Sequence, residues 1–284
     1  MAALPPYTTS FERIWHYAFR VICGLILFFL IMPILVIIPL SFNAGDYFTF
    51  TKEMLALDPA GYSLQWYQDF FTNPNWQGAV RNSVIISIFS TLIATTLGTL
   101  AALGLSQAQM PAKSAIMALL LSPMIVPLII SAAGMYFFYS RVGLQGTLIG
   151  VILAHAALGT PFVVITVTAT LVGFDRSLIR AALGLGASPF TVLRRVIVPI
   201  ILPGVVSGAL FAFITSFDEV VVVLFVGSFE QRTIPWQMFS GIREHISPTI
   251  LAVATVLVGV SIVLLTVLEL LRRRSERLRG VASN

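Results

Sequence analysis

Six long apolar segments dominate the sequence, and each is long enough to cross a lipid bilayer. A spanning helix needs about 20 apolar residues, because the hydrocarbon core of a bilayer is about 30 Å thick. The segments cover residues 21–40, 84–105, 114–139, 146–172, 196–226 and 249–271. They are continuous runs rather than short alternating strands, which excludes an outer-membrane barrel. We therefore predict an all-α integral membrane protein, with six transmembrane helices in a single transmembrane domain.

Basic residues are distributed unevenly between the two predicted sides of the membrane. Of 17 Lys and Arg residues, twelve fall on the side of both termini and five fall on the other side. Cytoplasmic segments carry an excess of basic residues, so both termini are predicted to be cytoplasmic. The basic segment 272–279 directly follows an apolar segment, so we interpret it as an anchor at the bilayer surface. We expect no nucleic-acid partner.

Prolines interrupt several of the apolar segments. Pro123 and Pro127 lie in the third segment, Pro161 lies in the fourth, and Pro199 and Pro203 lie near the start of the fifth. Proline removes a backbone donor, so we expect each of these helices to bend or break.

Lysine and cysteine are rare, and their positions exclude two kinds of site. Lys52 and Lys113 are the only lysines, and neither follows the Gly-Lys-Ser/Thr pattern of a phosphate-binding loop. If ATP drives this protein, a separate chain must bind it. Cys23 is the only cysteine, which excludes disulfides and cysteine-based metal sites within the chain. We expect the chain itself to bind no metal and no cofactor.

A loop at residues 175–195, between the fourth and fifth segments, carries the most informative pattern. Residues 176–185 are predicted to form a short helix that Gly186 ends with a positive φ. Ser188 and Pro189 are typical of the N-cap and first turn of a second helix. One face of the first helix carries Arg180 beside an apolar stripe of Leu178, Ala181, Ala182 and Leu185. Outside the membrane core, the bilayer surface or a cytoplasmic partner must cover that stripe.

The spacing of this loop resembles the signature loop of the membrane subunits of binding-protein-dependent ABC importers. That signature reads Glu-Ala-Ala, three residues, Gly, nine residues and Ile-x-Leu-Pro. Here Ala181-Ala182 is followed at the same spacing by Gly186 and by Val196-Ile197-Val198-Pro199. Arg180 stands at the position of the Glu, so the polar contact of that Glu is not carried over to this chain.

Four further segments resemble the permeases of polyamine (spermidine and putrescine) importers. They are Ser41-Phe42-Asn43, Trp66-Tyr67, Arg81-Asn82-Ser83 and Ser216-Phe217-Asp218-Glu219. The resemblance implies a type I ABC importer permease of the bacterial inner membrane that pairs with a second, different permease. It also implies two cytoplasmic ATPase subunits, which bind ATP and Mg, and an extracytoplasmic solute-binding protein.

By the same resemblance, residues 180–185 would be the coupling helix that sits in a groove of the ATPase. The residues assigned to this ATPase-coupling loop are Leu178, Arg180, Ala181, Ala182, Leu185, Gly186, Ser188, Pro189 and Pro199.

Asp218 and Glu219 are the only carboxylates deep inside an apolar segment. A charge at that depth costs about 2.5–3.5 kcal/mol on insertion scales, so both should face protein or water. On a continuous helix, Thr215 shares a face with Asp218, and Ser216 lies one turn from Glu219. We assign these four residues to the substrate pathway, where the acids would attract a polyamine; a structural, hydrogen-bonded role is the alternative. His155 is predicted to be a packed, hydrogen-bonded residue rather than a ligand.

Other functions stay open at this level. A stand-alone secondary transporter would also use intramembrane charges and broken helices, but it would not require the cytoplasmic loop pattern. An ABC importer of this type could carry an opine, an amino-acid-like amine or an anion instead of a polyamine. An intramembrane serine protease would need a serine and a histidine arranged for attack, and the chain contains no Gly-x-Ser-x-Gly pattern. We therefore predict a non-enzymatic permease subunit.

Overall fold

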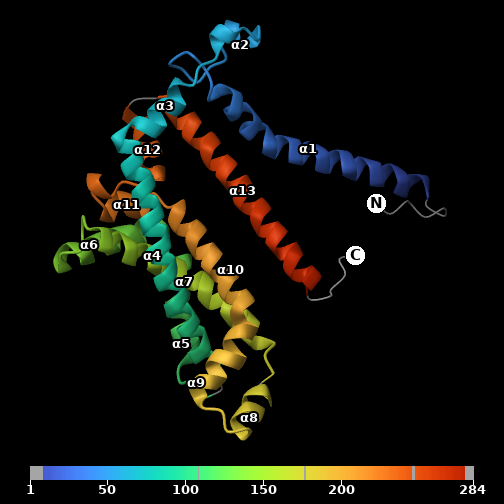
Figure 1. The fold of residues 1–284 in the computed structure, drawn as a ribbon, viewed down its shortest axis with the longest axis vertical. Helices are drawn as coiled ribbons and strands as arrows, with labels where there is room; N and C mark the ends of the chain where they lie inside the picture. The colour runs from blue at the N-terminus through green and yellow to red at the C-terminus, as the bar shows by residue number, and fades with distance from the viewer. Residues whose placement is uncertain (1–8, 108, 176, 245–246, 279–284) are drawn as a thin grey trace. The chain divides into compact units, whose positions relative to one another are not determined.

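The protein is all-helical, as predicted. The computed structural model describes residues 9–107, 109–175, 177–244 and 247–278, and within these ranges the only β-type pairing is an isolated bridge between Asn43 and Tyr62. The chain divides into two compact units, one formed by residues 1–73 and 241–284 and the other by residues 74–240 (Figure 1). Arg176 and Arg279, two of the basic residues used to predict the orientation, lie outside the described residues.

The first unit contains both ends of the described chain. Its elements are α1 (Ser10–Leu40), α2 (Lys52–Leu55), the 3-10 turn η1 (Pro59–Gly61), α3 (Gln65–Thr72) and α13 (Thr249–Leu278). A capping box starts α1: the Thr9 hydroxyl accepts the backbone N–H of Glu12, whose carboxylate accepts the backbone N–H of Thr9. Within this unit α13 packs against α1 and α3.

Two of the segments that resemble polyamine permeases contact each other in the region after α1. The Trp66 indole N–H donates to the backbone carbonyl of Asn43 at 2.7 Å, and the hydroxyls of Ser41 and Tyr67 are 2.6 Å apart. The Asn43 side chain also donates to the carbonyls of Tyr47 and Thr49. Ser41-Phe42-Asn43 and Trp66-Tyr67 therefore shape one small lobe of the first unit.

The second unit holds the central helices. Its elements are α4 (Pro74–Leu105), α5 (Lys113–Ile125), α6 (Leu128–Val142), α7 (Leu148–Val172), α8 (Ser177–Gly184), α9 (Pro189–Val192), the π-helical turn η2 (Leu193–Ile197), α10 (Val198–Phe217), α11 (Val221–Val226), the 3-10 turn η3 (Phe229–Gln231) and the first part of α12 (Ile234–Glu244). Helices α4, α7 and α10 pack against one another and form the bundle at its centre (Figure 1).

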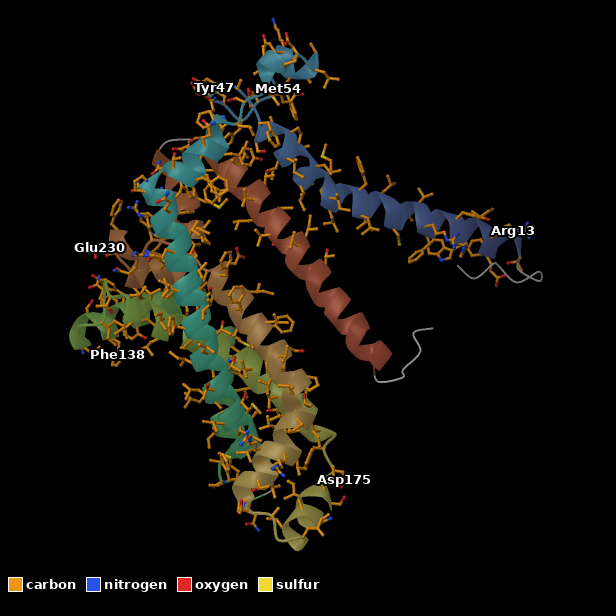
Figure 2. The ribbon with its side chains drawn as sticks, in the orientation of Figure 1. Arg13, Tyr47, Met54, Phe138, Asp175 and Glu230 are labelled. Carbon is orange, nitrogen blue, oxygen red and sulfur yellow. The ribbon has the colours of Figure 1, made fainter. Side chains whose placement is uncertain are left out.

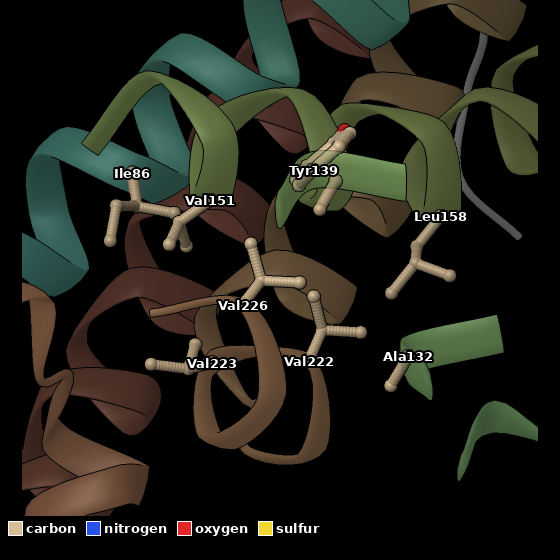
Figure 3. Close-up of a cluster of buried hydrophobic side chains, with 9 residues drawn as sticks. Ile86, Ala132, Tyr139, Val151, Leu158, Val222, Val223 and Val226 are labelled. Carbon is tan, nitrogen blue, oxygen red and sulfur yellow. The ribbon is translucent and has the colours of Figure 1, made fainter. Parts of the chain in front are cut away.

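A buried cluster attaches α11 to this bundle. Figure 3 shows its side chains, which come from α4, α6, α7 and α11: Ile86, Ala132, Tyr139, Val151, Ala154, Leu158, Val222, Val223 and Val226. The backbone N–H of Gly146, in the turn between α6 and α7, also donates to the carbonyl of Val226 at 2.8 Å. The short helix α11 is thus fixed by packing and by a hydrogen bond at its end.

Small residues allow the three central helices to approach closely. A Cβ atom on Gly98 would lie 2.7 Å from the Cβ of Val163. A Cβ on Gly208 would lie 2.5 Å from the hydroxyl of Thr166 and 2.8 Å from the Cα of Val163. All three distances are shorter than van der Waals contact, so glycine is required at both positions for this close packing.

We expect Gly208→Ala to lower the thermal stability of the detergent-solubilised protein, because the added methyl group would push α10 away from α7. Overpacking of this kind costs about 1–3 kcal/mol. Gel filtration after stepwise heating measures the midpoint temperature. Gly134→Ala is the matched control, since a Cβ on that α6 glycine would meet nothing within 4 Å. Equal midpoint temperatures for the two variants would show that the close contact at Gly208 does not contribute to the stability of the protein.

The described residues contain four helices that are long and apolar enough to cross a membrane: Ser10–Leu40, Pro74–Leu105, Leu148–Val172 and Pro189–Phe217. A fifth candidate is the pair α5 and α6, which is bent by 104° at a break just before Leu128. The break coincides with Pro127, whereas Pro161 and Pro203 lie inside helices that continue past them. The described apolar part of α13 is the shorter stretch Thr249–Val263. Six spans therefore stay a prediction.

One difference from the predicted helices concerns the fifth apolar segment, expected to run to residue 226. Helix α10 ends at Phe217, and α11 begins only at Val221. The physical reason lies in Glu219, one position before the N-cap Val220, whose carboxylate accepts the backbone N–H groups of Val222 and Val223 and so stabilises the start of a new helix.

Candidate functional site

The loop between α7 and α10 begins with a side-chain cap. Asp175 accepts hydrogen bonds from the backbone N–H and the hydroxyl of Ser177, at 2.8 and 2.6 Å. These bonds hold the pKa of the Asp175 carboxyl below its ordinary value. The carboxylate is therefore ionised beside the first turn of α8, where a negative charge is favourable.

The turn after α8 has the geometry that the sequence predicts. Gly186 has a φ of +84°, which disfavours residues with a side chain. The backbone N–H of Ala187 donates to the carbonyl of Ala182 at 3.1 Å, closing the end of the helix. Ser188 then caps α9, its hydroxyl accepting the N–H of Thr191 at 3.3 Å, and Pro189 occupies the first turn. Two short helices therefore meet at a defined angle.

The apolar residues of this loop are largely uncovered in the described part of the chain. Leu178 is 45% exposed and Leu185 is 90% exposed. Arg180 and Ala181 are exposed beside them, and Ala182 is half-buried. Figure 2 places Asp175 at the end of the second unit where α8 lies. The surface formed by α8 and α9, which we call the loop surface, is thus an apolar face at one end of the central bundle.

Sequence reasoning missed one member of the loop surface. Phe190 in α9 is 70% exposed. It is the only aromatic residue between positions 175 and 195, which was the available signal. Pro199, the last of the assigned loop residues, is exposed in the first turn of α10, directly after the π-helical turn η2.

The four residues assigned to a pathway divide into two pairs at the break between α10 and α11. Asp218 is exposed and Thr215 is half-buried. Ser216 and Glu219 are only 4% and 6% exposed. Because Asp218 is exposed, Thr215 is half-buried and the other two are buried, the four do not form a single lining.

Ser216 and Glu219 belong to a buried polar cluster, which we call the junction. The hydroxyl of Ser90 donates to the Ser216 hydroxyl at 2.8 Å, and Nδ1 of His155 is 2.9 Å from the same oxygen. Nε2 of His155 is 3.5 Å from a carboxylate oxygen of Glu219. The prediction that His155 is packed and hydrogen-bonded is confirmed. Ser90 was missed, although Ser83, Ser87 and Ser90 follow helical spacing within an apolar segment.

Asn82 and Ser83 fasten the loop that follows α11. The Asn82 amide donates to the carbonyls of Glu230 and Arg232, at 2.7 and 3.0 Å. The hydroxyl of Ser83 accepts the N–H of Ile234 at 2.8 Å. Figure 2 shows Glu230 in the part of the second unit away from Asp175. These contacts give a structural role to two residues of the segment Arg81-Asn82-Ser83, which resembles the polyamine permeases.

Comparison with known proteins gives a consistent result. Residues 94–279 match the family described as "Binding-protein-dependent transport system inner membrane component". The spermidine/putrescine transport system permease protein PotC of Haemophilus influenzae is 33% identical over 247 residues, covering 87% of this chain and 93% of that protein. The putrescine transport system permease protein PotI of Escherichia coli is 28% identical, covering 81% of this chain and 82% of that protein.

Solved structures of low sequence identity share the fold. A chain of a bacterial ABC transporter involved in the import of the acidic polysaccharide alginate has a TM-score of 0.71 at 16% identity, covering 93% of this chain and 99% of that chain. A chain of the MetNI methionine ABC transporter in an inward-facing conformation has a TM-score of 0.52 at 21% identity, covering 72% of this chain and 95% of that chain.

Proposed function

The chain belongs to the family of binding-protein-dependent transport system inner membrane components, and from this premise we propose that it is a permease subunit of an ABC importer for polyamines such as putrescine or spermidine. The membership confirms the resemblance drawn from the cytoplasmic loop. It makes the chain a membrane subunit of a transporter rather than a member of a catalytic family. We propose that it sits in the bacterial inner membrane with six spans and both termini in the cytoplasm.

The observation that carries the proposal is the loop surface. Two short helices joined at Gly186 present Leu178, Leu185 and Phe190 to their surroundings at one end of the central bundle. An exposed apolar face on an ordered, capped loop is suited to docking in a groove of another protein. We assign that groove to a cytoplasmic ATPase subunit, which binds ATP and Mg.

The same proposal includes three further partners. A second permease, different from this chain, would complete the transmembrane pathway, and a second ATPase subunit would dock on it. An extracytoplasmic solute-binding protein would deliver the substrate. Closure of the ATPases would move the two permeases between inward-open and outward-open states, so that the loop surface transmits motion between two global states.

The choice of a polyamine has two supports. Relatives at about 30% identity over most of the chain are named as spermidine/putrescine permeases. In addition, Asp218 is an exposed carboxylate at the break in the fifth apolar segment, with Thr215 beside it. A carboxylate attracts the ammonium groups of a polyamine, so we place these two residues in the substrate pathway.

Competitive uptake tests the substrate class. We expect the complete complex in proteoliposomes to take up labelled putrescine, and unlabelled spermidine to compete with it. Amino acids, opines and oxyanions should not compete at the same concentration. Competition by one of these other solutes, with none by polyamines, would overturn the substrate assignment while leaving the importer assignment in place.

A further inference from the structure

We propose that Glu219 does not contact the substrate, and that the junction of Ser90, His155, Ser216 and Glu219 instead positions Asp218 for a cationic substrate. The inference rests on the proposed function, because it takes Asp218 as the acid that faces the pathway. It assigns different tasks to two neighbouring acids that the sequence cannot tell apart.

Glu219 is already engaged by the backbone of its own chain. Its two carboxylate oxygens accept the N–H of Val222 at 2.8 and 2.9 Å, and one of them accepts the N–H of Val223 at 3.3 Å. The residue is only 6% exposed. A substrate ammonium could reach the carboxylate only if these bonds were broken and the first turn of α11 were opened. Glu219 therefore acts as the cap that starts α11.

The junction ties this cap to three long helices. Ser90 comes from α4, His155 from α7 and Ser216 from α10, and each is at most 4% exposed. The Ser216 hydroxyl accepts a hydrogen bond from Ser90 and can donate one to Nδ1 of His155. With Ser216 as the donor, the ring hydrogen is on Nε2, which lies 3.5 Å from the Glu219 carboxylate without a hydrogen bond between them. His155 thus lies between Ser216, near the end of α10, and Glu219, just before α11.

The position of Asp218 follows from that end point. Asp218 closes α10, its N–H donating to the carbonyl of Ile214 at 3.0 Å, and its side chain is exposed while that of Glu219 is buried. Without the Glu219 cap, nothing in the sequence from Asp218 to Val221 stops α10 from continuing, because the stretch contains neither Gly nor Pro. Ending the helix at Phe217 leaves Asp218 at the last turn of α10, at the open end of the break, rather than in the middle of a continuous helix. The junction therefore positions Asp218 by fixing where α10 ends.

Thiol labelling of the assembled complex tests this division of roles. Cys23 is the only cysteine of the chain, so Cys23→Ser with Asp218→Cys gives a single reporter. The probe is a cationic methanethiosulfonate reagent, and modification of this chain is read by mass spectrometry. We expect the reporter to react, and putrescine to slow the reaction. Ser216→Ala or Glu219→Gln should change the reaction rate by about threefold or more, as for the loss of one net hydrogen bond.

Ser207→Ala is the matched control, since it removes an exposed serine from the same helix and should leave the rate unchanged. If Ser216→Ala prevents assembly, Ser90→Ala removes only one hydrogen bond of the junction and can be used instead. It should shift the rate of thiol modification in the same direction as Glu219→Gln. Equal rates in all variants would overturn the positioning role. A reactive reporter that putrescine fails to protect would instead contradict the pathway assignment of the proposed function, so the two failures are distinguishable.

Discussion

Replacing Gly186 with proline is expected to uncouple ATP hydrolysis from transport. Gly186 has a φ of +84° and donates its N–H to the carbonyl of Leu183 at 2.9 Å. Proline fixes φ near −65° and has no N–H, so α9 could not keep its angle to α8. A backbone penalty of about 3 kcal/mol, borne by the docked state, would weaken ATPase binding about 100-fold.

Co-purification of the ATPase with the tagged chain, followed by uptake in proteoliposomes, measures the effect of Gly186→Pro. Gly134→Ala is a suitable control, because Gly134 lies in α6, outside the loop surface, and a Cβ there would meet nothing within 4 Å. It should bind the ATPase and transport like the parent. Undiminished ATPase binding and uptake by Gly186→Pro would remove the docking role from the loop surface.

Asp218→Asn is expected to lower polyamine uptake about tenfold or more, the range for losing a hydrogen bond to a charged group, while the complex still assembles. The side chain is exposed at the end of α10, so neutralising it leaves no buried partner unpaired. The substitution should therefore lower the rate of uptake without lowering assembly, and the KM for putrescine should rise.

Asp46→Asn provides the control for Asp218→Asn, since Asp46 is an exposed acid of the first unit. This variant should keep the KM of the parent. Assembly is checked in both variants by the amount of ATPase that co-purifies. Equal uptake by Asp218→Asn and the parent would take Asp218 out of the substrate pathway.

Features set by a few neighbouring residues could be predicted from the sequence. The turn between α8 and α9 depends on Gly186, Ser188 and Pro189, and each acts on the backbone within four residues. Long apolar runs predicted helices for a similar reason, because backbone groups in a bilayer must be satisfied within the segment. The all-helical fold class and the capped turn between α8 and α9 were therefore accessible without the structure.

The junction could not be predicted in this way. Ser90 and Ser216 are 126 positions apart, and His155 and Ser216 are 61 positions apart. Their contacts depend on the packing of α4, α7 and α10, which one sequence does not specify residue by residue. For the same reason sequence patterns could not distinguish Asp218 from Glu219, whereas the structure exposes Asp218 and buries Glu219.

The exposed apolar surface of the loop was only partly predicted. Spacing identified Leu178 and Leu185 because the predicted helix over 176–185 carries both on one face, although in the structure α8 ends at Gly184, directly before Leu185. Phe190 lies on the next helix, beyond the turn at Gly186, so helical periodicity could not place it on the same surface. The angle between the two helices had to be known first.

The most direct test of the central claim is the energy source for uptake by reconstituted proteoliposomes. If the chain is a permease of an ABC importer, putrescine enters only when the ATPase subunits are present and ATP is supplied on their side of the membrane. Uptake should stop when the ATPase is omitted or ATP is replaced by a non-hydrolysable analogue, whatever ion gradient is imposed. Uptake that an ion gradient drives in liposomes containing this chain without any ATPase would contradict the account.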